Sequence, residues 1–132
     1  MSGGEVKARQ RASKERRRVP RFVLDQDAFV VMRPHFDRIG KVRNIGPGGM
    51  CIEYVTSGAS GPCRGEVDLF LGNGGFRITR IPCRVVYDHT VEKGELPNSY
   101  QIRRCGLAIE ELSATQRQAL EMLLRRHVAA SA

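Results

Sequence analysis

The chain has 132 residues, 41% of them hydrophobic and 27% charged, and its formal net charge is +8. This length predicts one domain around a single core and leaves too little chain for a second folded unit. No apolar run approaches the roughly 18 residues of a membrane span, and the N-terminus lacks the apolar stretch of a signal peptide, so we expect a cytoplasmic protein without a membrane span.

The positive charge is concentrated at the N-terminus. Residues 1–21 carry eight Lys or Arg against two Glu, a net charge of +6, whereas residues 22–132 are nearly balanced at +2. Because such an arm has almost nothing apolar to bury, we expect residues 1–15 to be disordered until they meet an anion. Charge alone also fits a solvated tail without a partner, a nucleic-acid contact or an anionic lipid surface.

Four guanidinium groups follow within one short run, Arg16-Arg17-Arg18-Val19-Pro20-Arg21. Proline disfavours helix at the residue before it, so we expect Arg17 and Arg21 on an extended segment. An arginine can meet a phosphate, or the O6 and N7 edge of guanine, with two parallel hydrogen bonds. The run therefore predicts a site for an anion or a purine.

A glycine-rich turn, Asn44-Ile45-Gly46-Pro47-Gly48-Gly49, comes after two expected strands, an apolar one within 22–32 and a short one over 38–44. The next strand alternates, with Met50, Ile52 and Tyr54 on its inner face. Asn44 offers a donor and an acceptor to a base edge, and glycines let a ligand approach the backbone. We expect this turn to lie beside the arginine run, at one rim of an antiparallel sheet.

The clearest hairpin lies between residues 67 and 87, with the turn at 72–75. Its inner face is expected to hold Val67, Leu69, Leu71, Ile81, Cys83, Val85 and Tyr87. Arg80 and Arg84 have the opposite parity and should face solvent. The polar segment 89–98, which contains Gly94 and Pro97, predicts the longest internal loop.

The end of the chain predicts a last strand and a helix. Cys105, Leu107 and Ile109 should face inward, while Gly106 and Ala108 leave room for close packing on the other face. Ser113 with Gln116 fits a capping box, and apolar residues at helical spacing follow, so we expect a helix over 113–128 and a tail over 129–132.

Catalysis is not expected. The cysteines at 51, 63, 83 and 105 form no C-x-x-C pair and no metal-like spacing with the histidines, so we expect free thiols and no metal. The sequence has no nucleophile elbow, no P-loop and no H-E-x-x-H. We therefore expect a protein that is not an enzyme and needs no cofactor.

Arg17-x-x-x-Arg21 and Asn44-x-Gly46-x-x-Gly49 resemble the signature of the PilZ domain family, R-x-x-x-R followed by [D/N]-x-S-x-x-G. The resemblance covers residues 16 to about 126. It implies a mainly β domain over 16–128, a small antiparallel six-stranded split β-barrel with a C-terminal helix, that binds cyclic di-GMP. Arg17 and Arg21 would grip guanine and phosphate, Asn44 would read a guanine edge, and Gly49 would admit the ligand. The expected ligand-binding residues are Arg16, Arg17, Arg18, Arg21, Asn44, Gly46, Gly48 and Gly49.

Two functions follow from this resemblance. The first is a cyclic di-GMP receptor that passes the signal to a protein partner in motility, secretion or biofilm regulation, through its C-terminal helix or its ligand-ordered arm. The second is a degenerate adaptor that binds no nucleotide, because Gly46 stands where the family pattern has serine. Under the receptor hypothesis, Gly46→Ser should strengthen binding. With five Phe, three Tyr and no Trp, the body offers no aromatic-rich patch for stacking bases, so no specific nucleic-acid partner is expected.

Overall fold

The computed structural model describes residues 20–33, 38–57, 64–72, 74–96 and 99–132. Most of these residues form strands, and one helix follows the seventh strand. The elements are β1 (Phe22–Leu24), β2 (Ala28–Met32), β3 (Ile39–Gly46), β4 (Gly49–Thr56), β5 (Arg64–Leu71), β6 (Arg77–Lys93), β7 (Gln101–Ile109), α2 (Ala114–Arg126) and β8 (Val128–Ser131).

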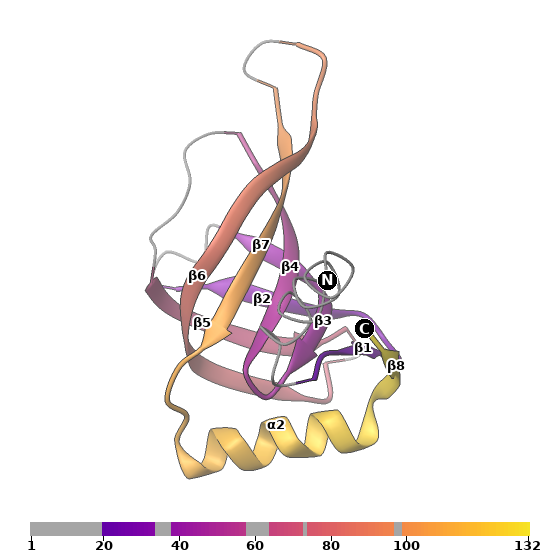
Figure 1. The fold of residues 1–132 in the computed structure, drawn as a ribbon, viewed down its shortest axis with the longest axis vertical. Coiled ribbons are helices and arrows are strands. Elements are labelled where there is room, and N and C mark those ends of the chain that lie inside the picture. The colour runs from indigo at the N-terminus through magenta and orange to yellow at the C-terminus, as the bar shows by residue number, and fades with distance from the viewer. Residues whose placement is uncertain (1–19, 34–37, 58–63, 73, 97–98) are drawn as a thin grey trace, which may run out of the picture.

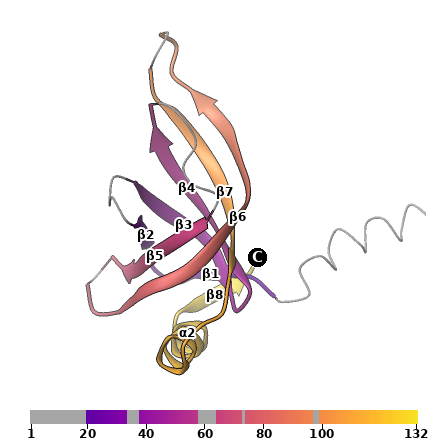
Figure 2. The same cartoon turned by 90° about the vertical axis from the view of Figure 1, so that its left-hand side faces the viewer.

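The strands form a closed barrel. Their order in the sheet is β2-β5-β6-β7-β4-β3-β1-β8, and β2 also pairs with β3, which closes the first six into a ring. Neighbouring strands are antiparallel throughout. Figures 1 and 2 show the barrel with α2 lying across one end of it. The six-stranded antiparallel barrel with a C-terminal helix, predicted from the sequence, is confirmed.

Alternation along the strands builds the core inside the barrel. On β5, the buried residues are Val67, Leu69 and Leu71, as predicted, and Ile81 and Cys83 complete this side from β6. Arg80 and Arg84 are exposed, also as predicted. Because neighbouring side chains on a strand point to opposite faces, one face of each strand fills the barrel and the other is left for surface chemistry.

Helix α2 begins with the predicted capping box. The Ser113 hydroxyl accepts from the Gln116 backbone N–H at 3.1 Å, and the Gln116 side chain accepts from the Ser113 N–H at 2.9 Å. Leu120 and Leu123 are buried and close the core at this end of the barrel. The helix ends at Arg126, two residues before the predicted end, because the chain then turns into β8.

The C-terminal segment differs from the expected tail over 129–132. Val128–Ser131 forms β8, which pairs with β1 so that Phe22 lies opposite Ser131 and Val23 opposite Ala130. The Ala132 N–H donates to the Arg21 carbonyl at 2.9 Å. This pairing provides hydrogen-bond partners for backbone groups along the edge of β1. The four-residue sequence of β8 does not by itself indicate a strand.

Residues 89–98 also differ from the expected loop. Strand β6 continues to Lys93 and pairs with β7 as far as Gln101, so the two strands extend beyond the barrel as a long hairpin (Figure 1). At the far end of this hairpin, the Gly94 N–H donates to the Tyr100 carbonyl at 2.9 Å. This part of the strand can consist of polar residues because the projecting ribbon is not covered by the core. The polar composition of residues 89–93 was therefore not evidence for a loop.

Candidate ligand-binding site

The two segments singled out in the sequence meet at the start of β1. Strand β1 pairs with β3 so that Phe22 lies opposite Ile45. Continued by one residue, this register places Arg21 opposite Gly46 and diagonal to Asn44 on the same face, and Nη1 of Arg21 donates to Oδ1 of Asn44 at 3.2 Å. Both side chains are half-buried. The predicted adjacency of the arginine segment and the glycine turn is confirmed for Arg21.

The turn after β3 is a tight hairpin in which Gly46 pairs with Gly49. A Cβ atom at Gly49 would lie 2.8 Å from Nη2 of Arg21 and 2.5 Å from the Leu107 carbonyl oxygen. The guanidinium of Arg21 therefore lies directly on the backbone of Gly49, and a side chain at this position would displace it. The room that Gly49 was expected to give a ligand is occupied here by Arg21.

The absence of a side chain at Gly46 lets the backbone of Pro20 pack against the turn. A Cβ atom there would lie only 2.0 Å from the Pro20 carbonyl oxygen, a backbone atom that cannot swing aside as a flexible side chain can. Gly46 is buried beneath Pro20. The missing serine hydroxyl is therefore only part of what glycine changes at this position, because glycine also lets Pro20 lie close to the turn.

The remaining predicted residues divide into two groups. The Gly48 carbonyl accepts from the Ile109 N–H at 2.9 Å, which ties the turn to the end of β7. Arg16, Arg17 and Arg18 lie outside the described residues, so their ligand roles stay predictions.

Small residues form a floor beside Arg21 on the outer face of the barrel. Gly49 lies opposite Ala108, and Cys51 lies opposite Gly106, across the pairing of β4 with β7. Together, Gly49, Cys51, Gly106 and Ala108 are called the small-residue floor. Arg21 and Asn44 border it on one side. On the other side, β6 places Arg84 opposite Ala108 and Tyr87 opposite Gly106.

Tyr87 does not point into the core as its parity predicted. The pairing of β6 with β7 shifts register between Val85 and Tyr87, and this irregularity turns Tyr87 to the outer face. Its ring lies so close to Gly106 that a Cβ atom there would be 2.2 Å from Cε1. Its hydroxyl donates to Sγ of Cys51 at 3.3 Å. The room expected over Gly106 is thus filled by an aromatic ring, which sequence parity could not have shown.

Charged groups continue this outer face beyond the floor. Glu53 accepts from Nη2 of Arg104 at 2.7 Å and from Nη1 of Arg43 at 2.8 Å. The hydrogen bond from Arg104 is the main cause that holds the pKa of Glu53 below its ordinary value. His89 adds a ring whose centroid is 5.4 Å from that of Tyr87, with 24° between the planes. This face therefore presents cationic and aromatic groups next to Arg21.

Comparison with known proteins supports one architecture. No family model and no curated protein matches the sequence. Among solved structures, the PilZ domain of YcgR from Escherichia coli, with c-di-GMP, aligns with a TM-score of 0.54 at 14% identity, over 83% of this chain and 90% of that one. The chain has a PilZ-like fold.

A second structure agrees with the PilZ-like fold. MrkH, a transcription regulatory factor dependent on c-di-GMP, aligns with a TM-score of 0.58 at 19% identity. The alignment covers 83% of this chain and 49% of MrkH, so the PilZ-like domain spans about half the length of that protein. At these identities the likeness concerns the fold, and the site has to be argued from the residues of this chain.

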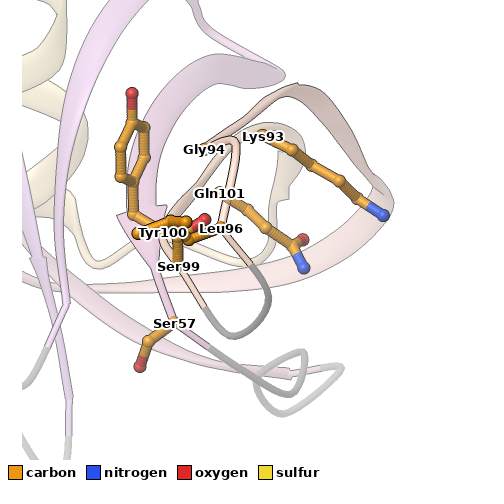
Figure 3. A pocket seen from close by; sticks show the side chains of 7 residues that line it. All are labelled: Ser57, Lys93, Gly94, Leu96, Ser99, Tyr100 and Gln101. Atoms are coloured by element: carbon orange, nitrogen blue, oxygen red, sulfur yellow. The ribbon is translucent and has the colours of Figure 1, made fainter.

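The PilZ-like domain also has a pocket at the turn of the long hairpin. It has a volume of about 230 Å³ and is lined by Ser57, Lys93, Gly94, Leu96, Ser99, Tyr100 and Gln101 (Figure 3). Thr56 and Gly49 mark the two ends of β4, so this pocket lies roughly 20 Å from the small-residue floor along the strand. Among the described lining residues, Lys93 is the one with a charged side chain.

Three further observations concern metal binding, membrane spans and the cysteines. In the described part of the chain, no cluster of three or more His, Cys, Asp or Glu could hold a metal ion. Within the same residues, no helix has the length and apolar character needed to cross a membrane. Cys51, Cys83 and Cys105 are buried free thiols, and burial raises the pKa of Cys83 and of Cys105 to about 12.

Proposed function

We propose that this chain is a non-enzymatic cyclic di-GMP receptor whose site is the outer surface around Arg21, Asn44 and Gly49. The observation that carries the proposal is the Arg21 guanidinium, held by Asn44 at 3.2 Å and lying against the Gly49 backbone. It rests at the edge of a PilZ-like barrel, and one structural neighbour with that fold contains c-di-GMP.

The chemistry of this site suits a guanine nucleotide. A guanidinium fixed in orientation can donate two parallel hydrogen bonds to the O6 and N7 edge of guanine or to a phosphate. Asn44 accepts from Arg21 through its carbonyl oxygen, which leaves its NH2 group to donate to a base edge. Arg16, Arg17 and Arg18 would add charge from the arm and steer a dianionic ligand to the site.

The signal would pass to a protein partner. The arm that we expect to order on the ligand enters β1, and β1 pairs with β8, which directly follows α2. The C-terminal helix or the ordered arm would present the surface that the partner recognises. We propose a cytoplasmic protein that acts in motility, secretion or biofilm regulation.

Calorimetric titration with cyclic di-GMP tests the proposal. Wild type should bind cyclic di-GMP selectively over GTP and over a short single-stranded DNA. Arg21→Ala should weaken binding by one to two powers of ten, because a hydrogen bond to a charged group contributes about 1.5 to 3 kcal/mol. Arg17→Ala should act in the same direction. Arg125→Ala, which removes an exposed arginine of α2, is the matched control and should bind as wild type does.

The adaptor is the second candidate, and the placement of Gly46 favours it. Gly46 is covered by the Pro20 carbonyl, so this residue offers no open surface to a nucleotide in the described structure. A folded wild-type protein that gives no heat with cyclic di-GMP would reject the receptor and support the adaptor. Affinity that is unchanged in both Arg21→Ala and Arg17→Ala would reject the proposed site while leaving nucleotide binding intact.

A further inference from the structure

Tyr87 occupies a position that core packing does not explain. The register shift in β6 turns it away from the barrel interior, where Val85 and Cys83 pack against the core. The ring covers Gly106, and its side chain remains 38% exposed. A β-bulge that redirects an aromatic side chain to an open face is a feature that proteins use next to binding sites.

The ring lies beside the proposed nucleotide site. Its hydroxyl contacts Cys51, and the Arg21 guanidinium lies on Gly49. Gly49 and Cys51 are two residues apart on β4 and therefore face the same side, roughly 7 Å from each other. Arg21 and Tyr87 thus reach over the small-residue floor from opposite sides, one from β1 and the other from β6.

The floor brings both groups close to the sheet. Gly106 has no side chain to lift the Tyr87 ring, and Gly49 has none to lift the guanidinium. A flat ring and a guanidinium at similar height above one sheet match two features of a purine nucleotide, its π face and its hydrogen-bonding edge or phosphate. The nearly parallel ring of His89 extends the aromatic surface along β6.

We propose that Tyr87 is a base-stacking residue, on which a guanine of the bound cyclic dinucleotide lies while Arg21 holds its edge or its phosphate. This inference rests on the proposed function and adds a second wall to that site. The sequence contains no Trp, and its parity pattern assigned Tyr87 to the core, so the sequence alone gave no stacking group.

Substitutions at residue 87 separate the ring from its hydroxyl. In calorimetric titration with cyclic di-GMP, Tyr87→Leu should lose about ten- to a hundredfold in affinity, the effect of removing one base-stacking aromatic. Tyr87→Phe keeps the ring and loses only the hydroxyl, so its loss of affinity should be much smaller than that of Tyr87→Leu. Gly106→Ala places a methyl group where the Tyr87 ring now lies. It should weaken binding by displacing the ring, although residue 87 is still a tyrosine. Tyr100→Leu, at the turn of the long hairpin, is the control for loss of an exposed tyrosine.

A spectroscopic readout tests stacking directly. Because the chain has no tryptophan, Tyr87→Trp creates a single tryptophan, which can be excited apart from the remaining tyrosines, at the proposed contact. Saturating cyclic di-GMP should quench its emission, and Arg21→Ala in the same background should shift the quenching to higher ligand concentration. Tyr100→Trp, at the turn of the long hairpin, should show no quenching.

The outcomes separate this inference from the function on which it rests. Wild-type binding that Arg21→Ala weakens and Tyr87→Leu leaves unchanged would overturn the stacking role and keep the receptor. Emission from the Tyr87→Trp variant that does not respond to saturating cyclic di-GMP would overturn it as well. A wild-type protein that binds no cyclic di-GMP would overturn the receptor and the stacking role together. Thermal unfolding of each variant shows that the comparison is made between folded proteins.

Discussion

A tyrosine and an arginine lie near each end of the paired strands β4 and β7, contributed at one end by these two strands and at the other by their neighbours. At the end beside the glycine turn, Tyr87 contacts the Cys51 thiol and Arg21 contacts the Asn44 amide. At the other end, Tyr54 and Arg103 both donate to the carboxylate of Asp88, at 2.6 and 2.8 Å.

The chemistry of the partner separates the two ends. A carboxylate compensates the charge of Arg103 and accepts from the Tyr54 hydroxyl at once, so both donors are used for structure. An amide orients a guanidinium without contributing a charge to it. The same two residue types can therefore form a structural network at one end and, as we propose, a ligand site at the other.

The largest expected effect on stability comes from disrupting the network of Tyr54, Arg103 and Asp88, called the structural end below. Arg103→Leu would leave the Asp88 carboxylate, whose side chain is 14% exposed, without its cation. The free energy of unfolding should fall by about 3 kcal/mol, measured by urea denaturation. Binding of cyclic di-GMP by the folded fraction should not change. Arg21→Ala should show the reverse, with lost affinity and a nearly unchanged unfolding transition, and equal stability losses in both variants would remove the distinction between the ends.

An intermediate effect is expected at Gly46. Gly46→Ser would push against the Pro20 carbonyl oxygen, so the arm would have to move. We expect a loss of about 1 to 3 kcal/mol in stability, as for other overpacked sites, together with weaker binding. This reverses the expectation drawn from the family pattern. Gly65→Ser is the matched control, because a Cβ there would lie 3.5 Å from its nearest contact, an ordinary distance. Tighter binding by Gly46→Ser would show that the arm leaves Gly46 when ligand binds.

The smallest effect is a pH dependence at the structural end. Burial, and then the hydrogen bond to Asp88, raises the pKa of Tyr54 from 10.0 to about 12. The folded state thus favours the neutral phenol, and this contribution is complete below pH 10 and is lost as the pH rises through 12. Urea denaturation between these pH values should show a steeper loss of stability in wild type than in Tyr54→Phe. Parallel curves would exclude Tyr54 as the titrating group.

Much of the fold follows from local sequence. The alternation of Val67, Leu69 and Leu71 predicted their burial, and Ser113 with Gln116 predicted the start of α2. The pairing of Arg21 with Asn44 could also be anticipated, since an extended arginine segment and a glycine turn at a sheet rim each specify a local structure.

What could not be anticipated depends on partners distant in sequence. The outward position of Tyr87 results from a register shift against β7, and a single strand carries no mark of it. Strand β8 forms by pairing with the edge of β1. Its own sequence, Val-Ala-Ala-Ser, lacks the alternation of apolar and polar residues that would predict a strand. Likewise, the close contact between Gly46 and Pro20 becomes visible only when these two distant segments of the chain lie side by side.

The hydrogen bond from Ala132 to the carbonyl of Arg21 is also a mechanical link. Tension applied to the chain after β8 would be transmitted through this bond to the backbone of the arginine that we place in the nucleotide site. Since β8 and β1 run antiparallel, the load would reach the residue 21 end of β1 first. A partner that pulls on the C-terminal segment would therefore act on the backbone of the residue that we propose to hold the ligand, with no need to deform the barrel.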